Sequence, residues 1–75
     1  MQQLASHTFE LELGALLRSR VMFELKKGAV RYGVEFTYEE RKGFFDSDYI
    51  CTVRGEHSRV RAYLRACNEY FEVIR

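Results

Sequence analysis

The chain has 75 residues, of which 47% are hydrophobic and 31% charged, and its formal net charge is +1. This balance is typical of one folded domain, residues 1–75, and excludes a disordered chain. The low net charge excludes a general electrostatic attraction to nucleic acid or to anionic membranes, so an electrostatic site has to be local.

Apolar runs in the chain are short. None approaches the roughly 18 residues that a membrane-spanning helix needs. Residues 1–10 carry neither the cationic region nor the apolar region of a signal peptide. The sequence therefore predicts a cytoplasmic protein that does not bind a membrane.

The first predicted element is a strand in the stretch HTFELEL, residues 7–13, which ends at Gly14. Apolar and polar residues alternate there, which is typical of a strand with one buried face. The residues predicted to face the core are Phe9, Leu11 and Leu13.

Residues 20–26 and 29–38 are predicted to form a hairpin, with Lys27 and Gly28 as its turn. Both stretches alternate apolar and polar residues. One register pairs apolar residues on one face and opposite charges on the other. The apolar pairs are Leu25 with Val30, Phe23 with Tyr32 and Val21 with Val34, and the charged pairs are Glu24 with Arg31 and Arg20 with Glu35.

A fourth strand is predicted in YICTVR, residues 49–54, and its register against the third strand stays open. Its inward residues are Tyr49, Cys51 and Val53. From residue 58 the apolar period becomes that of a helix of about sixteen residues, with Ser58 as its N-cap. The predicted inward face of this helix comprises Val60, Tyr63, Leu64, Cys67, Phe71 and Ile74.

The predicted fold is a two-layer α+β domain, in which a four-stranded antiparallel sheet (β-β-β-β-α order) carries the C-terminal helix on one face. Four strands form a layer about 20 Å wide and up to about 36 Å long. A helix about 24 Å long is too small to cover it.

This mismatch in size predicts a homodimer, in which the aromatic third strand and the uncovered sheet face pack against a second copy. The alternative is a monomer in which the N-terminal segment, with Leu4, Leu16 and Leu17, closes the gap. Phe44 and Phe45 are adjacent and cannot both face one core from a strand. The residues predicted to contact a partner are Val30, Tyr32, Val34, Phe36, Tyr38, Phe44 and Phe45.

Two cysteines, Cys51 and Cys67, fall on core-facing positions and are predicted to be buried thiols, with a disulfide between helix and sheet as the alternative. Together with His7 and His57 they do not form a zinc-binding pattern. The paired carboxylates of residues 39–40 and 46–48 are predicted to be solvated turn residues. No enzyme motif is present, so we expect no catalytic residue, no metal and no cofactor.

Basic residues gather around the start of the predicted C-terminal helix. Cations there, and Glu72 near the other end, oppose the preference of the helix dipole. Such a conflict indicates a partner or an anionic ligand, although arginine is also a good helix former. The candidate residues for an anion or nucleic-acid site are Arg54, His57, Arg59, Arg61 and Arg65.

Three functions follow from these patterns. The favoured one is a non-catalytic, homodimeric protein-interaction module, and the alternative is a small binder of nucleic acid or phosphate that uses the Arg/His cluster. A third is an enzyme or carrier with a pocket between helix and sheet, lined by Tyr32, Tyr63 and Cys67. RNA binding on the open sheet face is excluded because that face carries several carboxylates, from Glu10, Glu12, Glu24, Glu35 and Glu39.

Overall fold

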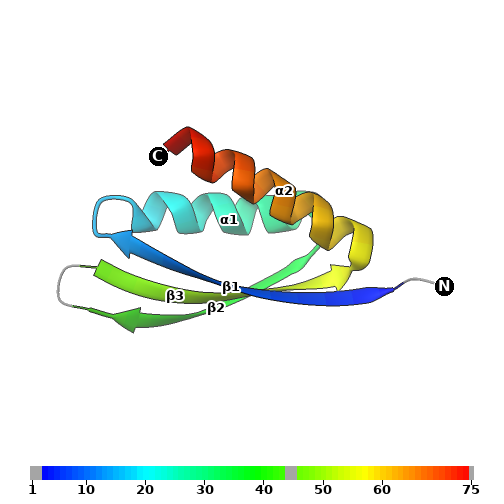
Figure 1. Ribbon diagram of the computed structural model, residues 1–75, viewed down its shortest axis with the longest axis horizontal. Coiled ribbons are helices and arrows are strands. Elements are labelled where there is room, and N and C mark those ends of the chain that lie inside the picture. Colours follow the sequence, from blue (N-terminus) through cyan, green and yellow to red (C-terminus); the bar gives the residue numbers. More distant parts are fainter. Residues whose placement is uncertain (1–2, 44–45, 75) are drawn as a thin grey trace.

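A computed structural model describes residues 3–43 and 46–74, with side chains up to residue 72. The elements are β1 (Leu4–Gly14), α1 (Arg18–Tyr32), β2 (Glu35–Lys42), β3 (Asp46–Glu56) and α2 (His57–Ile74). The three strands form an antiparallel sheet of order β1-β3-β2, and both helices lie on one face of it (Figure 1). The α+β class and a C-terminal helix on the sheet are as predicted, but the four-stranded order is wrong.

The first error lies at residues 18–32, which form α1 and not a strand. Its buried residues include Val21, Met22, Leu25 and Ala29, which recur with the period of a helix. The predicted hairpin required Phe23 to face inward, but that side chain is 63% exposed. Val21 and Leu25 fit both periods, and Met22 and Ala29 fit only the helix, so the helical period decides which residues are buried.

The predicted third strand is divided at Gly33. This glycine has φ of 69° and ends α1 in the left-handed conformation, and its N–H donates to Val30 C=O at 3.2 Å. The N–H of Val34 donates to Ala29 C=O at 3.0 Å, which completes a Schellman motif. Residues 28–32 therefore belong to a helix, and only the part from Glu35 onward is a strand.

Gly28, predicted as a turn residue, lies inside α1 and has a packing role instead. A Cβ atom at this position would lie 3.3 Å from Cε2 of Tyr63. The missing side chain thus lets the ring of Tyr63, on α2, lie close to the backbone of α1.

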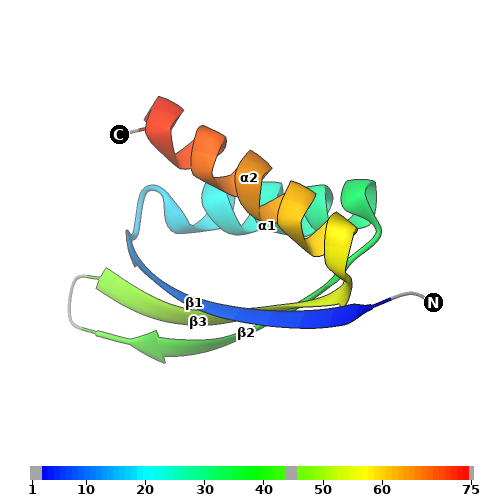
Figure 2. The ribbon, with the colours of Figure 1, turned by 45° about the vertical axis from the view of Figure 1, so that its right-hand side comes forward.

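Strands β1 and β3 pair over their whole length, from Leu4 with Glu56 to Gly14 with Asp46. Strand β2 pairs with the other side of β3, so β1 and β2 run parallel on either side of it and α1 connects them across the sheet (Figure 2). The predicted inward residues of the first and fourth strands do face the helices. Among them are the directly paired residues Phe9 and Cys51.

The core lies between the sheet and the two helices. Its most completely buried side chains include Val21, Cys51, Val53 and Tyr63, each at most 1% exposed. Cys51 and Cys67 are buried as free thiols, which confirms the thiol interpretation. The predicted mismatch in size assumed one helix over four strands. The structure has two helices over three strands, so that assumption is wrong.

Helix α2 begins at His57, before the predicted N-cap Ser58, and Ser58 is not its cap. The carboxylate of Glu56 instead accepts the N–H of Ser58 at 3.2 Å and its hydroxyl at 2.6 Å. These two bonds hold the pKa of Glu56 below its ordinary value. Within residues 3–43 and 46–74, no helix is both long and apolar enough to cross a membrane.

Candidate functional site

The residues predicted to contact a partner do not form one stripe. Val30 lies on the outer side of α1, 84% exposed, while Tyr32, Val34 and Phe36 pack against the core. Tyr38 is 40% exposed on β2. Phe44 and Phe45 lie outside the described residues.

The predicted anion-binding residues are divided into three places. Arg54 lies on the outer sheet face, opposite the helices, as the strand register shows. The guanidinium of Arg59 lies at the end of α1, where a Cβ on Gly33 would be 2.5 Å from its Nη1, and its Nε is 3.9 Å from Glu56. A cation at a helix C-terminus is stabilising, so Arg59 has a structural role.

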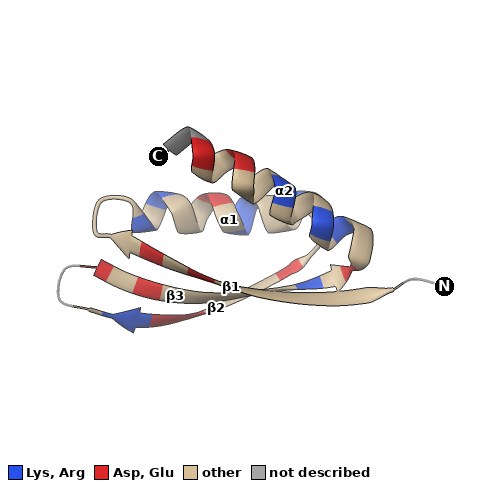
Figure 3. Cartoon of the chain, viewed as in Figure 1, with Lys and Arg blue, Asp and Glu red and all other residues tan. Residues whose placement is uncertain are grey.

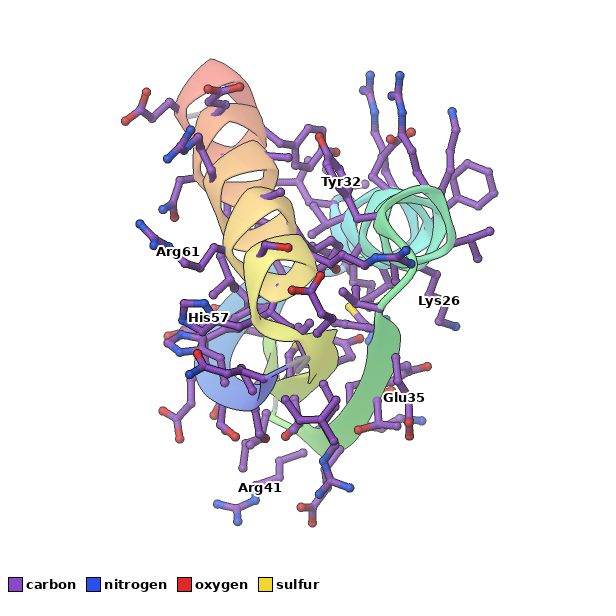
Figure 4. All side chains as sticks on the ribbon, turned by 90° about the vertical axis from the view of Figure 1, so that its right-hand side faces the viewer. Lys26, Tyr32, Glu35, Arg41, His57 and Arg61 are labelled. Carbon is purple, nitrogen blue, oxygen red and sulfur yellow. The ribbon has the colours of Figure 1, made fainter. Side chains whose placement is uncertain are left out.

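The other three residues share one side of α2. His57, Arg61 and Arg65 recur every four residues and are exposed. Figure 4 shows the labelled His57 and Arg61 on the side of α2 that is turned away from α1. We call these three residues the α2 basic stripe.

Charge is separated between the two layers of the molecule. Helices α1 and α2 carry eight Lys and Arg and three Glu, a net charge of +5. The three strands carry three Lys and Arg and eight Asp and Glu, a net charge of −5 (Figure 3). The near-neutral total therefore conceals a cationic helix layer and an acidic sheet.

A groove runs between α1 and the edge strand β2, and we call it the α1–β2 groove. Its volume is about 510 Å³. Phe23 stands exposed at its rim, and Lys26 reaches from α1 toward β2 (Figure 4). The groove is lined by Arg18, Ser19, Met22, Phe23, Lys26, Tyr38, Glu40, Lys42 and Tyr49.

Three of these lining residues are cations and one is a carboxylate. The ammonium of Lys26 lies 3.5 Å from the hydroxyl of Tyr38 and 5.1 Å from the centre of its ring, a cation–π arrangement that holds both side chains in place. Arg18 donates a hydrogen bond of 3.1 Å to Ser47 Oγ. The groove is thus a cationic surface with an aromatic wall.

The N-terminus of α1 adds to this character. Its N-cap residue is Leu17, whose side chain makes no capping hydrogen bond, and the first turn holds no acidic residue. The first N–H groups of a helix have no acceptor within the helix and carry a partial positive charge. Because Arg18 and Ser19 line the groove, this positive end lies beside it.

Backbone groups of β2 face the solvent at the same place. The N–H of Gly43 donates to Asp46 C=O at 2.8 Å, which continues the β2–β3 ladder. In an antiparallel pair, successive residues point their N–H and C=O alternately toward and away from the partner. The residues that point these groups outward are Phe36, Tyr38, Glu40 and Lys42.

A second cavity, of about 160 Å³, lies between α1 and α2. The three residues predicted to line a pocket, Tyr32, Tyr63 and Cys67, do line it, although between two helices and not between helix and sheet. Burial raises the pKa of Cys67 and of Tyr63, and it raises the pKa of Cys51 to about 11. These groups therefore stay protonated at neutral pH.

Carboxylates gather at one end of the outer sheet face. The neighbouring carboxylate of Asp46 raises the pKa of Glu12, and the charge of Asp48 raises it further. Among the residues that the structure describes, no group of three or more His, Cys, Asp or Glu is arranged to hold a metal ion.

Sequence reasoning missed the α1–β2 groove because it assigned Phe23 to the core and gave Lys26 no role. The helical period of residues 18–32 is the signal that places both on the outside. In comparisons with known proteins, no family model matches the chain, and no curated protein and no solved structure matches it either.

Proposed function

We propose that the chain is a non-catalytic protein-binding domain, which holds an extended acidic segment of a partner protein in the α1–β2 groove. The observation that carries this proposal is a groove beside an edge strand that combines exposed aromatic side chains with cations. These residues are Phe23, Arg18 and Lys26 of α1 and Tyr38 and Lys42 of β2. The partner segment adds as a further strand to β2.

The backbone supplies the affinity for an extended chain. Outward N–H and C=O groups at Tyr38 and Glu40 are free to pair with a strand, as in other domains that bind peptides at a sheet edge. Side chains of the even-numbered β2 residues lie on the helix side of the sheet, so alternate side chains of the added strand enter the groove. This geometry supports the proposed mode of binding.

The side chains supply the specificity. Phe23 offers apolar surface for an aliphatic or aromatic residue of the partner, and burying such a residue contributes about 1.5–3 kcal/mol. Lys26 and Lys42 favour a carboxylate of the partner close to that apolar residue. Exposed apolar side chains ringed by charge are typical of protein interfaces, which favours a protein over a nucleic acid as the partner.

A displayed library of random peptides of about nine residues, slightly longer than an average strand, tests the proposal. Enriched peptides are expected to contain Asp or Glu together with an apolar residue. Their affinity should fall about tenfold or more with Phe23→Ser and with Lys26→Glu. The matched control is Val30→Ser, since Val30 is even more exposed on the same helix but does not line the groove.

Peptides that bind the Phe23→Ser and Val30→Ser variants equally well would show that the groove is not the site. The nucleic-acid alternative predicts a different outcome in a separate binding experiment. In that case a mixed pool of oligonucleotides would bind the chain, and the binding would be lost with Arg61→Glu in the α2 basic stripe but kept with Phe23→Ser.

A further inference from the structure

The two edge strands of the sheet differ in how they are protected from pairing with other chains. Strand β2 is eight residues long and five of them are charged. Strand β1 is eleven residues long, pairs with β3 without a bulge, and carries only Glu10 and Glu12 as charged residues. Proteins usually protect long edges with lysine, proline or a bulge, and β1 has none of them.

The free backbone groups of β1 can be assigned. The N–H of His57 donates to Gln3 C=O at 2.7 Å, which continues the β1–β3 ladder by one pair. The hydroxyl oxygens of Thr8 and Thr52 lie 3.2 Å apart, as expected for a closely spaced pair without backbone hydrogen bonds. By alternation, N–H and C=O point outward at Leu4, Ser6, Thr8, Glu10 and Glu12.

Helix α2, which packs over β1 and β3, carries charges in an unusual order. Its N-terminal half holds Arg61 and Arg65, its C-terminal half holds Glu69 and Glu72, and this order opposes the helix dipole at both ends. Two such helices that run antiparallel side by side would place each basic half against an acidic half. The charge pattern is thus complementary to itself.

We propose that the chain forms a symmetric homodimer in which β1 pairs antiparallel with β1 of a second copy and the two α2 helices lie side by side. Antiparallel pairing centred on Phe9 uses the whole strand, from Leu4 opposite Gly14 of the second copy. Glu10 then lies opposite Thr8 and Glu12 opposite Ser6, so no two carboxylates are paired. The two sheets become one sheet of six strands.

Apolar burial supports the same arrangement. Phe9 and Leu11 lie at the open edge on the helix side and are only half buried in one chain. Pairing centred on Phe9 brings its ring against the same ring of the second copy, beneath the two α2 helices. Edge pairing therefore covers apolar surface that a single chain leaves exposed.

Light scattering coupled to size exclusion tests the proposal at about 50 µM chain, a concentration that favours association by mass action. The expected mass is twice the 8.9 kDa of one chain. Thr8→Pro removes an outward N–H from β1 and should reduce the mass to that of one chain. Glu40→Pro removes an outward N–H from the other edge strand and should leave the dimer unchanged.

A charge exchange tests the α2 contact without proline. Arg61→Glu with Arg65→Glu makes the α2 surface acidic, and Glu69→Arg with Glu72→Arg makes it basic, so each double variant alone should be monomeric. Mixed in equal amounts, the two should form a heterodimer. This result does not depend on whether the Thr8→Pro chain folds.

A single-chain mass for the unchanged protein would overturn the proposal. A dimer that survives Thr8→Pro in a folded chain would overturn the role of β1. Double charge variants that remain homodimers, or that fail to combine when mixed, would overturn the α2 contact.

Discussion

Two tyrosines of α2 provide a test of the interhelical packing, because both hydroxyls are buried and, within the part of the chain that the structure describes, only that of Tyr63 makes a hydrogen bond. The hydroxyl of Tyr63 donates to Leu25 C=O, on α1, at 2.8 Å. The hydroxyl oxygen of Tyr70 is buried and has no hydrogen-bond partner among the described residues. Replacement by phenylalanine keeps each ring and removes only the hydroxyl, so the two variants should respond differently.

The size of the difference follows from the two environments. Tyr63→Phe removes a made hydrogen bond and should lower the free energy of unfolding by about 1 kcal/mol. Leu25 C=O lies inside α1 and still accepts a helical N–H, so no full penalty for an unpaired group is added. Tyr70→Phe removes a buried polar atom without a partner and should leave stability unchanged or raise it by up to about 1 kcal/mol.

Urea unfolding followed by far-ultraviolet circular dichroism measures both variants, and thermal unfolding serves as a second readout. For a domain of this size about 1 kcal/mol corresponds to roughly 4–8 °C in Tm. Tyr63→Ala is unsuitable, because a loss of about 3–5 kcal/mol approaches the whole stability expected of 75 residues, roughly 4–11 kcal/mol. Equal losses for the two phenylalanine variants would refute the assigned bond between α2 and α1.

Three further predictions concern α1 and the thiols. Val30→Ala should raise Tm by a few degrees, because Val30 is exposed in a helix and alanine has a helix propensity higher by about 0.6 kcal/mol; a fall in Tm would indicate a strand. Gly33→Ala should lower the free energy of unfolding by about 1 kcal/mol in urea titrations, since φ is 69° there; an unchanged midpoint would contradict the Schellman motif. Raised thiol pKa values mean that the folded state holds these protons more tightly than the unfolded state. The contribution of the protonated thiols to the free energy of unfolding is therefore complete below about pH 9. It should be lost as the pH rises toward about 11, the pKa of Cys51. A urea midpoint that stays constant from pH 8 to pH 11 would contradict that burial.

Strands β1 and β3 were predictable because their alternation is local and unambiguous. Phe9 and Leu11 in β1, and Tyr49 and Cys51 in β3, turn toward the helices while the residues between them face solvent. Residues 58–74 were predictable as a helix for the same reason, since their helical period continues over several turns.

Helix α1 was missed because its spacing satisfies two periods at once. Val21, Leu25 and Tyr32 fit a strand and a helix equally well, and Gly28 resembles a turn residue. The agreement between apolar and charged pairs in the predicted hairpin was not independent evidence, because both sets of pairs follow from folding the sequence back at Gly28. Helix formers such as Met22 and Ala29 were the contrary signal.

The α1–β2 groove depends on the strand order, and no local pattern specifies that order. Insertion of β3 between β1 and β2 requires long-range pairing of β1 with β3, from Gly14 with Asp46 to Leu4 with Glu56, in addition to the local pairing of β2 with β3. That insertion makes β2 an edge strand and places α1 beside it. No local sequence pattern therefore predicts that Phe23 and Tyr38 line the same groove.

The strand order also relates the two proposals to each other. Because β1 and β2 are opposite edges of one sheet, pairing through β1 leaves β2 free at both outer edges of a six-stranded dimer. The dimer then presents two α1–β2 grooves, and a partner with two acidic segments that reach both would bind about 10²- to 10⁴-fold more tightly than a partner with one. Thr8→Pro should remove this gain and leave the affinity for a single segment unchanged, whereas Phe23→Ser should weaken the binding of both kinds of partner. These two variants therefore test the proposed roles of β1 and β2 separately, although both strands are edges of the same sheet.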